Sequence, residues 1–511
     1  MNCRDERQEI AEKLAASCSA GPPSFPVLEA SCAELVGAMA GGRLSCRALV
    51  KSYLKRIALF DSTVNSMICL NPRILEEAER AEEELRAGTA GALCGLPVIV
   101  KDNINTKDLP TTMGSLALRG SRPKSDAFIV ERLRRAGALI LGKSSLSEFA
   151  CTGMTNNSLI GQTLNPYDLT RTPGGSSGGT GAALAMNFAA AGLGTDGVNS
   201  VRSPASSNCL VGLRPTRGLL SRRGMLPSSP TQDMPGIMGR RAEDVVLLLD
   251  ALAWPDECDE AASGISPWPA PGYFVALKSY SLRGKRLGLL KVNCGNDPDV
   301  LRAVNGAAQV MERCGMEVVE LEEPFLDCEC LLRENNLIRF EQKDSVESYL
   351  SGEENGMALR LFSECLNSGL IVEDALRSLQ ASFRLGRASN DEEYRRRLRN
   401  REATREKTLE LMESLRLDGL FYPSQRILTV PVGAPGGQAG RNGIIASNLG
   451  FPAISFPAGF SAPSKTAPIG LPIGMELLGA PLSEKFLLAA ASAFEKTARI
   501  RKAPPGFPDV V

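Results

Sequence analysis

Apolar residues between positions 30 and 59 recur at spacings of three and four, which is the period of a helix face. Leu35 and Met39 begin this pattern, and Ile57 lies near its end. A further helix is predicted over 74–86, where charged residues dominate and leave a solvated surface. The first part of the chain is therefore expected to be largely helical.

From Gly95 onward, short apolar runs alternate with helical patterns. Leu96–Val100 is a continuous apolar run of strand length, and a helix predicted over 128–136 leads into a second such run over 138–141. The same criteria predict strands over 286–290, 419–422, 453–456 and 471–478, and helices over 298–316 and 486–494. This alternation predicts an α/β fold built on a β-sheet.

The chain is expected to form a single domain over residues 30–511, preceded by a loose lead-in over 1–29. Residues of about 255–415 are rich in helical patterns and are interpreted as an insertion within that domain. The strongly charged stretch 392–413 inside the insertion is predicted to be a solvated helix face.

Composition narrows the classes of partner and chemistry. The 511 residues include 58 Lys plus Arg and 58 Asp plus Glu, and this balance gives no electrostatic basis for nucleic-acid binding. No apolar run reaches the ~18–20 residues of a membrane span and no signal peptide is recognised, so a cytoplasmic location is expected. The sequence contains no His, which excludes Ser-His-Asp and Cys-His catalysis and His-ligated metals within this chain.

Three short motifs match known sites but favour structural interpretations. Gly137–Ser144 fits the P-loop pattern, yet the four residues between its glycines are apolar and predict a buried strand. Ser52 and Lys55 fit the S-x-x-K motif of penicillin-binding enzymes, yet they lie in a helical pattern without the companion motifs. Gly174–Gly178 contains the G-x-S-x-G elbow of α/β-hydrolases, whose mechanism needs the His that this chain lacks.

A larger set of ordered segments resembles the amidase-signature family. These segments are Gly95–Asn103, Gly142–Phe149, Gly161–Pro166, Pro173–Gly179, Gly194–Ala205, Gly212–Gly218, Gly450–Gly459 and Gly470–Gly479. The resemblance extends from about residue 30 to the C-terminus, with a signature core over about 95–218, and is weak across about 255–415. It implies the amidase-signature fold, with a large mixed β-sheet flanked by helices on both sides, and the activity of a serine amide hydrolase.

The resemblance also implies a catalytic triad. The family uses a Lys, a Ser that follows a cis peptide bond and a nucleophilic Ser, and the matching residues here are Lys101, Ser176 and Ser200. Neutral Lys101 would accept a proton from Ser176, which in turn takes the proton of Ser200 as Ser200 attacks the amide carbonyl. The apolar run before Lys101 predicts the burial that lowers the pKa of its amine. Supporting roles are expected for Ser177, Asp196 and Arg202.

The nucleophile segment departs from the family pattern. The family usually reads G-T-D-x-G-G-S, whereas this chain has Val198 and Asn199 before Ser200. The resemblance implies an oxyanion hole built from backbone N–H groups of this segment, at Gly197, Val198 and Asn199. Because Val resists positive φ, two outcomes are open: the loop keeps its shape and the side chains alter the pocket, or the hole is distorted. The first outcome is favoured because Lys101, Ser176, Ser200 and Asp196 are all intact.

The substrate pocket is expected to include Ala150, Cys151 and Thr152, whose small side chains predict an open near wall. The expected partner is a small-molecule or peptide amide, with no metal, no organic cofactor and no nucleic acid, and a homodimer is left open. Three alternatives to a simple amide hydrolase also stay open. They are a glutaminase subunit of an amidotransferase, an acyltransferase that uses the same acyl-enzyme, and a catalytically impaired binding protein.

Overall fold

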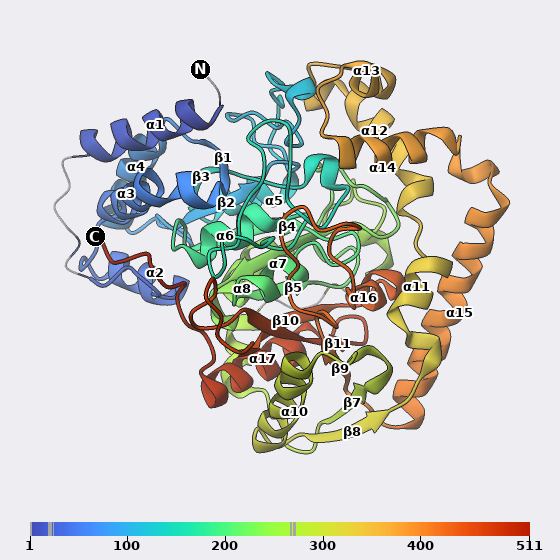
Figure 1. The fold of residues 1–511 in the computed structure, drawn as a ribbon. Coiled ribbons are helices and arrows are strands. Elements are labelled where there is room, and N and C mark those ends of the chain that lie inside the picture. The colour runs from blue at the N-terminus through green and yellow to red at the C-terminus, as the bar shows by residue number, and fades with distance from the viewer. Residues whose placement is uncertain (1–2, 19–22, 24, 266–267, 269–271, 511) are drawn as a thin grey trace.

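One mixed β-sheet runs through the centre of the protein (Figure 1). The computed structural model describes the chain apart from residues 1–2, 19–22, 24, 266–267, 269–271 and 511. The strands are β1 Met67–Leu70, β2 Pro97–Lys101, β3 Leu139–Ser144, β4 Ala191–Thr195, β5 Val211–Arg214, β6 Pro235–Gly239, β7 Arg286–Leu290, β8 Glu317–Leu321, β9 Gly419–Pro423, β10 Ala453–Phe460 and β11 Pro472–Gly479. Their order in the sheet is β1-β3-β2-β4-β6-β5-β10-β11-β9-β7-β8. Pairing is parallel around β2 and around β7 and antiparallel elsewhere, so the predicted mixed sheet is confirmed.

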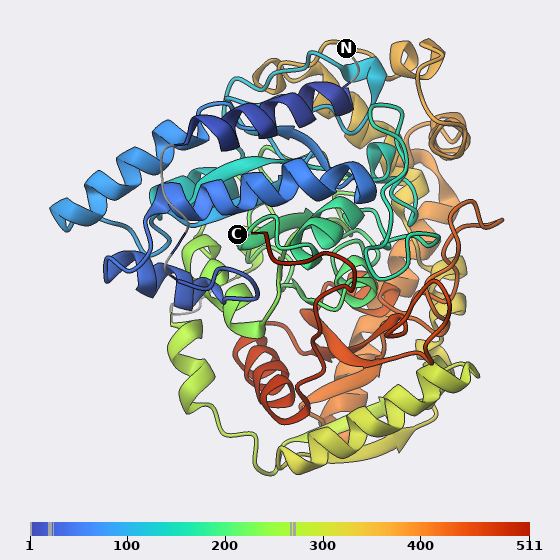
Figure 2. The ribbon, with the colours of Figure 1, turned by 60° about the vertical axis from the view of Figure 1, so that its left-hand side comes forward.

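Helices surround this sheet (Figures 1 and 2). They are α1 Cys3–Ser17, α2 Cys32–Ala40, α3 Cys46–Val64, α4 Ile74–Ala87, α5 Phe128–Arg135, α6 Gly178–Ala185, α7 Arg202–Ser207, α8 Ala242–Leu252, α9 Tyr273–Ser279, α10 Pro298–Arg313, α11 Cys328–Glu334, α12 Ile338–Ser351, α13 Phe362–Asn367, α14 Glu373–Arg384, α15 Glu392–Ser414, α16 Ile444–Leu449 and α17 Glu484–Ala498. Within the described ranges, every helix is too short or too polar to span a bilayer.

Helices cover both faces of the sheet, as the resemblance implies. Neighbouring residues of a strand point to opposite faces. Gly474 of β11 faces α7, since a Cβ there would lie 2.6 Å from Ser206 Oγ. Phe456 of β10 packs on Phe494 of α17, with ring centroids 4.8 Å apart. Phe456 pairs across the strands with Met475, the neighbour of Gly474, so α7 and α17 lie on opposite faces.

Helix α1 lies where the sequence predicts a loose lead-in. It packs against α3, where Arg7 Nε lies 3.0 Å from Asp61 Oδ2 in a buried ion pair, and Ala11 is fully buried beside it. The sequence pattern conceals this helix because its buried positions include the charged Arg7 and the small Ala11, so no strong apolar stripe marks the covered face. The expected lead-in therefore contains a helix that packs against the rest of the protein.

The middle of the chain supplies two strands and a set of helices. β7 and β8 extend the sheet at one edge, while α11 to α15 lie at one side of the molecule in Figure 1. α15 confirms the predicted solvated helix, although Arg397 and Arg401 on its inner face are buried. This region therefore forms a wall beside the sheet, and its helices reach the cavity described below.

Two parallel strands position the candidate site. β2 and β4 lie side by side, with Val100 opposite Leu193, so their carboxyl ends place Lys101 and Thr195 at the same edge. In open α/β sheets, ligands bind in the crevice outside these carboxyl ends. A Cβ at Gly194 would lie 2.7 Å from Ser177 Oγ, so this glycine lets the serine-rich turn approach β4 closely.

Candidate active site

Lys101 is the last residue of β2 and is fully buried. Its Nζ lies 2.7 Å from Ser176 Oγ and 2.8 Å from Thr195 Oγ1. Asn103 Nδ2 donates to the same Thr195 oxygen at 3.0 Å and so fixes the position of that hydroxyl. The amine is therefore held between two hydroxyl groups at the edge of the sheet.

Burial lowers the pKa of Lys101 to about 7, because the ammonium form loses its hydration inside the protein. The nearby carboxylates of Asp233 and Asp196 act in the opposite direction and favour the charged form. Asp233 is buried as well, and burial raises its pKa to about 6 although Lys101 lowers it. A substantial fraction of Lys101 is therefore a neutral amine near pH 7, able to accept a proton.

Two adjacent serines connect Lys101 to the loop after β4. The Gly175–Ser176 peptide bond is cis, as the resemblance implies, and the Ser176 side chain is buried. Ser177 donates its N–H to Ser200 O at 3.1 Å and its Oγ to Thr195 O at 3.2 Å. Ser177 thus ties the turn that carries Ser176 to the loop that carries Ser200.

Ser200 is half-buried and lines the same cavity as Ser176, with a volume of about 180 Å³. The residues Gly197–Ser200, all of which the structure describes, have no positive φ. Val198 therefore fits the loop without strain, and its side chain packs in an apolar cluster beside Ile338. This geometry agrees with the first of the two outcomes, in which the loop keeps its shape.

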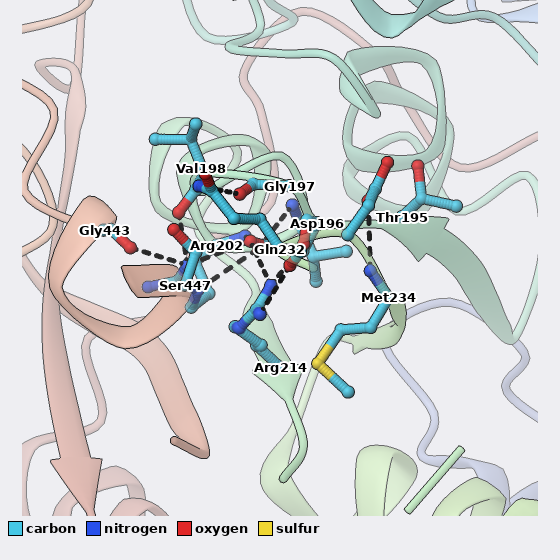
Figure 3. Close-up of polar contacts among 12 residues, drawn as sticks. Thr195, Asp196, Gly197, Val198, Arg202, Arg214, Gln232, Met234, Gly443 and Ser447 are labelled. Atoms are coloured by element: carbon cyan, nitrogen blue, oxygen red, sulfur yellow. Dashed lines mark hydrogen bonds and ion pairs between the residues drawn. The ribbon is translucent and has the colours of Figure 1, made fainter. Parts of the chain in front are cut away.

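The backbone N–H groups of residues 197–200 donate no hydrogen bond to the described residues of the chain. The carbonyls of the same loop are held elsewhere: Gln232 Nε2 donates to Gly197 O at 3.3 Å, and Arg202 Nη2 donates to Val198 O at 2.6 Å (Figure 3). Neighbouring unpaired N–H groups next to a serine are the donors that a developing oxyanion needs.

A buried ionic network supports this loop (Figure 3). Asp196 Oδ1 lies 2.9 Å from Arg202 Nη2 and 3.2 Å from Arg214 Nη1, and Arg202 also pairs with Glu476 of β11. Burial alone raises the pKa of Asp196, but Arg202 and Arg214 lower it to about 2. Asp196 Oδ2 accepts the N–H of Val201 at 3.0 Å, so the network fixes the chain just after Ser200.

The expected pocket residues Ala150, Cys151 and Thr152 line the same cavity. Phe149 and Ala150 have φ values of 52° and 57°, a left-handed conformation that is costly for residues with a side chain and is concentrated at functional sites. The structure adds a set of lining residues that the sequence did not indicate: Ser228, Asp233, Asn336, Ile338, Arg339, Gln342, Ser378, Ser382 and Arg441. Most of these come from the middle region, which completes the pocket wall.

Two of the three misleading motifs have the structural roles predicted for them. The P-loop match runs into the buried strand β3, and Lys143 Nζ donates to Ile104 O and to Thr111 Oγ1, each at 2.7 Å. Ser52 lies in α3 and donates to the carbonyl of Ala48 at 2.9 Å within the same helix. The Lys143 amine and the Ser52 hydroxyl are therefore both hydrogen-bonded inside the protein and are not presented to a ligand.

Four residues near Lys101, Ser176 and Ser200 are missed by motif reasoning. Asn103 and Thr195 lie in segments that resemble the family, but the residue types Asn and Thr do not by themselves indicate which hydrogen bonds the side chains make. Asp233 lies in a segment without a recognisable motif, so its position at the cavity could not be predicted from the sequence. Arg441 stands in a glycine-rich stretch, where a single arginine gives no signal.

Replacing Val198 and Asn199 together with glycine is expected to change the rate of amide turnover by less than about tenfold. The loop contains no left-handed residue, so glycine gives the backbone N–H groups no position that they lack now. A distorted oxyanion hole would instead predict a gain of about 100-fold or more, which is the cost of one lost donor. Steady-state kinetics on one amide, before and after the double substitution, distinguish the two outcomes.

Comparisons with known proteins agree with this geometry. The family model named Amidase matches residues 48–488. A glutamyl-tRNA(Gln) amidotransferase subunit of Symbiobacterium thermophilum is 34% identical over 501 residues, covering 93% of this chain and 98% of its own. The corresponding subunit of Thermus thermophilus is 35% identical over 485 residues, with the same coverage of 93% and 98%.

A solved structure is similar over almost its whole length. The native peptide amidase of Stenotrophomonas maltophilia superposes with a TM-score of 0.84 at 32% identity, covering 94% of this chain and 99% of its own. Sequence similarity, family model and fold therefore point to one group of enzymes that act on carbon–nitrogen bonds. The chain belongs to the amidase signature family.

Proposed function

We propose that this protein hydrolyses a carboxylic amide through an acyl-enzyme on Ser200, with Lys101 as the base and Ser176 as the proton relay. The observation that carries the proposal is the buried amine of Lys101, 2.7 Å from Ser176 Oγ, beside a cavity that Ser176 and Ser200 both line. Family membership supports it, and the absence of His is consistent with a base of another residue type.

In the first step, neutral Lys101 accepts the proton of Ser176 while the Ser176 oxygen accepts the proton of Ser200. Ser200 Oγ forms a bond to the amide carbon, and the carbonyl electron pair moves to the oxygen. The N–H groups of residues 197–200 stabilise the resulting negative charge. The product of this step is a tetrahedral intermediate on Ser200 with a protonated Lys101.

In the second step, the oxyanion electron pair returns and the carbon–nitrogen bond breaks. The proton on Lys101 passes through Ser176 to the leaving nitrogen, which departs as ammonia or an amine. Water then adds to the acyl-enzyme by the same relay and releases the carboxylic acid. The cycle regenerates neutral Lys101 and both serine hydroxyls.

Release of ammonia tests this proposal directly. Purified protein is incubated with an aliphatic primary amide, a peptide C-terminal amide and glutamine, and ammonia is measured over time. Ser200→Ala is expected to lower the rate on the best substrate by about 1,000-fold or more. Ser52→Ala serves as the matched serine control and is expected to leave the rate unchanged, because Ser52 bonds only its own helix. Folded wild-type protein that releases no ammonia from any of the three amides would count against the proposal.

The value of kcat/KM is expected to rise as the pH increases through about 7. The reason is that catalysis requires neutral Lys101, whose pKa is lowered to about 7. Asp233→Asn removes a negative charge that favours the ammonium form, so it lowers the pKa of Lys101 further. The acidic limb of the profile is therefore expected to move to lower pH in this variant. An unchanged or upward-shifted limb would argue that Lys101 is not the titrating group.

A second function is favoured by the curated relatives, which are amidotransferase subunits similar to this chain over nearly their whole length. We infer as the second candidate a glutaminase subunit that supplies ammonia to a partner protein. The same substrate panel separates the two functions. A marked preference for glutamine, with low turnover by the isolated chain, favours the amidotransferase role, whereas efficient turnover of other amides favours a free-standing amidase.

A further inference from the structure

Arg441 lies between two adjoining cavities. It lines the cavity of about 180 Å³ that contains Ser200, and it also lines a neighbouring cavity of about 610 Å³. Cys151 and Thr152 line both cavities too, so the two spaces meet at this wall. Arg441 therefore stands at the boundary between the larger cavity and the cavity that Ser200 lines.

Two glycines show how close the guanidinium is to the relay serine. A Cβ on Gly153 would lie 3.1 Å from Arg441 Nη1, so Gly153 leaves the space that the guanidinium occupies. A Cβ on Gly175 would lie 2.7 Å from the carbonyl carbon of Gly153, so these two backbones are in contact. The guanidinium is therefore separated from the Gly175–Ser176 turn by a single layer of backbone.

The positive charge of Arg441 has no counter-ion in the described part of the chain, and its guanidinium makes no hydrogen bond there. Burial alone lowers its pKa, and no charged neighbour offsets that effect. Arg441 is half-buried, whereas the fully buried Arg202 and Arg214 share the carboxylate of Asp196. A partly desolvated guanidinium without a counter-ion is stabilised by a carboxylate that a ligand brings to it.

The backbone around Arg441 is held in place before any ligand binds. Arg441 forms an isolated β-bridge with Gln425, and the flanking Asn442 donates its N–H to Ser424 O at 3.1 Å. Asn442 Nδ2 also donates to Pro423 O at 2.7 Å, at the end of β9. This segment is therefore anchored to the central sheet, which is the condition for a pre-organised binding group.

We propose that Arg441 binds a carboxylate of the substrate, and that the substrate is a small amide with a carboxylate a few carbon atoms from the scissile bond, such as the monoamide of a short dicarboxylic acid. This inference rests on the proposed amide hydrolysis at Ser200. A guanidinium matches a carboxylate with two parallel N–H donors, which sets both position and orientation. The cavity of about 180 Å³ lies below the ~300 Å³ typical of drug-sized ligands, which favours a compact substrate.

The test compares two amides of equal chain length, glutaric acid monoamide and pentanamide, which differ in the terminal carboxylate. Wild-type kcat/KM is expected to be at least about 100-fold higher for the charged amide. Arg441→Met is expected to remove this preference by lowering turnover of the monoamide about 100-fold while changing pentanamide less than about threefold. Arg441→Lys is expected to recover part of the preference, and Arg405→Met serves as a control at a distant arginine. Equal use of the two amides by wild-type protein, or parallel losses on both in Arg441→Met, overturns the inference.

A binding measurement separates this inference from the proposed hydrolysis. Calorimetry with glutaric acid monoamide and Ser200→Ala protein needs no turnover, and binding is expected to weaken at least about tenfold when Arg441→Met is added. Binding that depends on Arg441, in a wild-type protein that hydrolyses no amide, would support the carboxylate site and contradict the hydrolase. Binding that is absent, or equal with and without Arg441, would overturn the carboxylate site.

Discussion

Replacing Lys101 with methionine is expected to lower kcat/KM for amide hydrolysis by about 1,000-fold or more, since the chain then lacks the base that accepts the serine proton. Methionine has a similar length and fills the same buried space without a charge or a proton acceptor. The hydroxyls of Ser176 and Thr195 each lose one hydrogen-bond partner, which is a modest structural change. Steady-state kinetics on the best amide of the panel measure the effect.

The stability of the same variant shows whether the loss comes from catalysis or from misfolding. Lys101 has a lowered pKa of about 7 in the folded protein, so the unfolded chain binds an extra proton between about pH 7 and its ordinary value of 10.5. Wild-type stability from this group therefore rises as pH rises through that window, by on the order of 4 kcal/mol in total. Lys101→Met is expected to lack this rise in denaturant unfolding. Activity close to wild type in a folded variant would contradict the assignment of Lys101 as the base.

Replacing Arg202 with methionine is expected to lower the free energy of unfolding by about 3–5 kcal/mol. Arg202 is fully buried between Asp196 and Glu476, and its removal leaves Glu476 without its cationic partner and Asp196 with Arg214 alone. Its Nη2 also donates hydrogen bonds to the carbonyls of Val198 and Gly443, so the loop that carries Ser200 loses an anchor. Denaturant unfolding, read together with amide turnover, measures both consequences.

Arg405→Met is the control for this prediction. Arg405 makes a solvent-exposed ion pair with Glu402 within α15, and exposed pairs of this kind contribute about 0–1 kcal/mol. A loss of stability at Arg202 no larger than at Arg405 would show that the buried network does not hold the loop.

Local sequence patterns predicted the elements that carry the site. The apolar run before Lys101 is strand β2, and its complete burial gives the amine the environment that lowers its pKa. The α/β class follows from the same alternation of apolar runs and helical patterns, whereas the mixed sheet with helices on both faces was implied by the family resemblance. These features are predictable because each depends on residues that are close together in the sequence.

Features that depend on distant parts of the chain were not predictable from the sequence. Helix α1 is stabilised by the contact of Arg7 with Asp61 on α3, and its own charged surface gives no sign of that partner. Asp233 and Arg441 reach the cavity from separate loops, and Glu476 reaches Arg202 from β11. Their roles come from spatial neighbours that the fold brings together, and no local spacing encodes them.

The most direct test of the central claim is to locate a covalent adduct on the nucleophile. The purified protein is treated with a fluorophosphonate probe, and the modified peptide is identified by mass spectrometry in wild type, Ser200→Ala and Lys101→Met. The account predicts an adduct on Ser200 in wild type, no adduct there in Ser200→Ala, and much slower labelling in Lys101→Met. A folded wild-type protein that stays unlabelled, or that is labelled at another serine at the same rate in all three proteins, would contradict it.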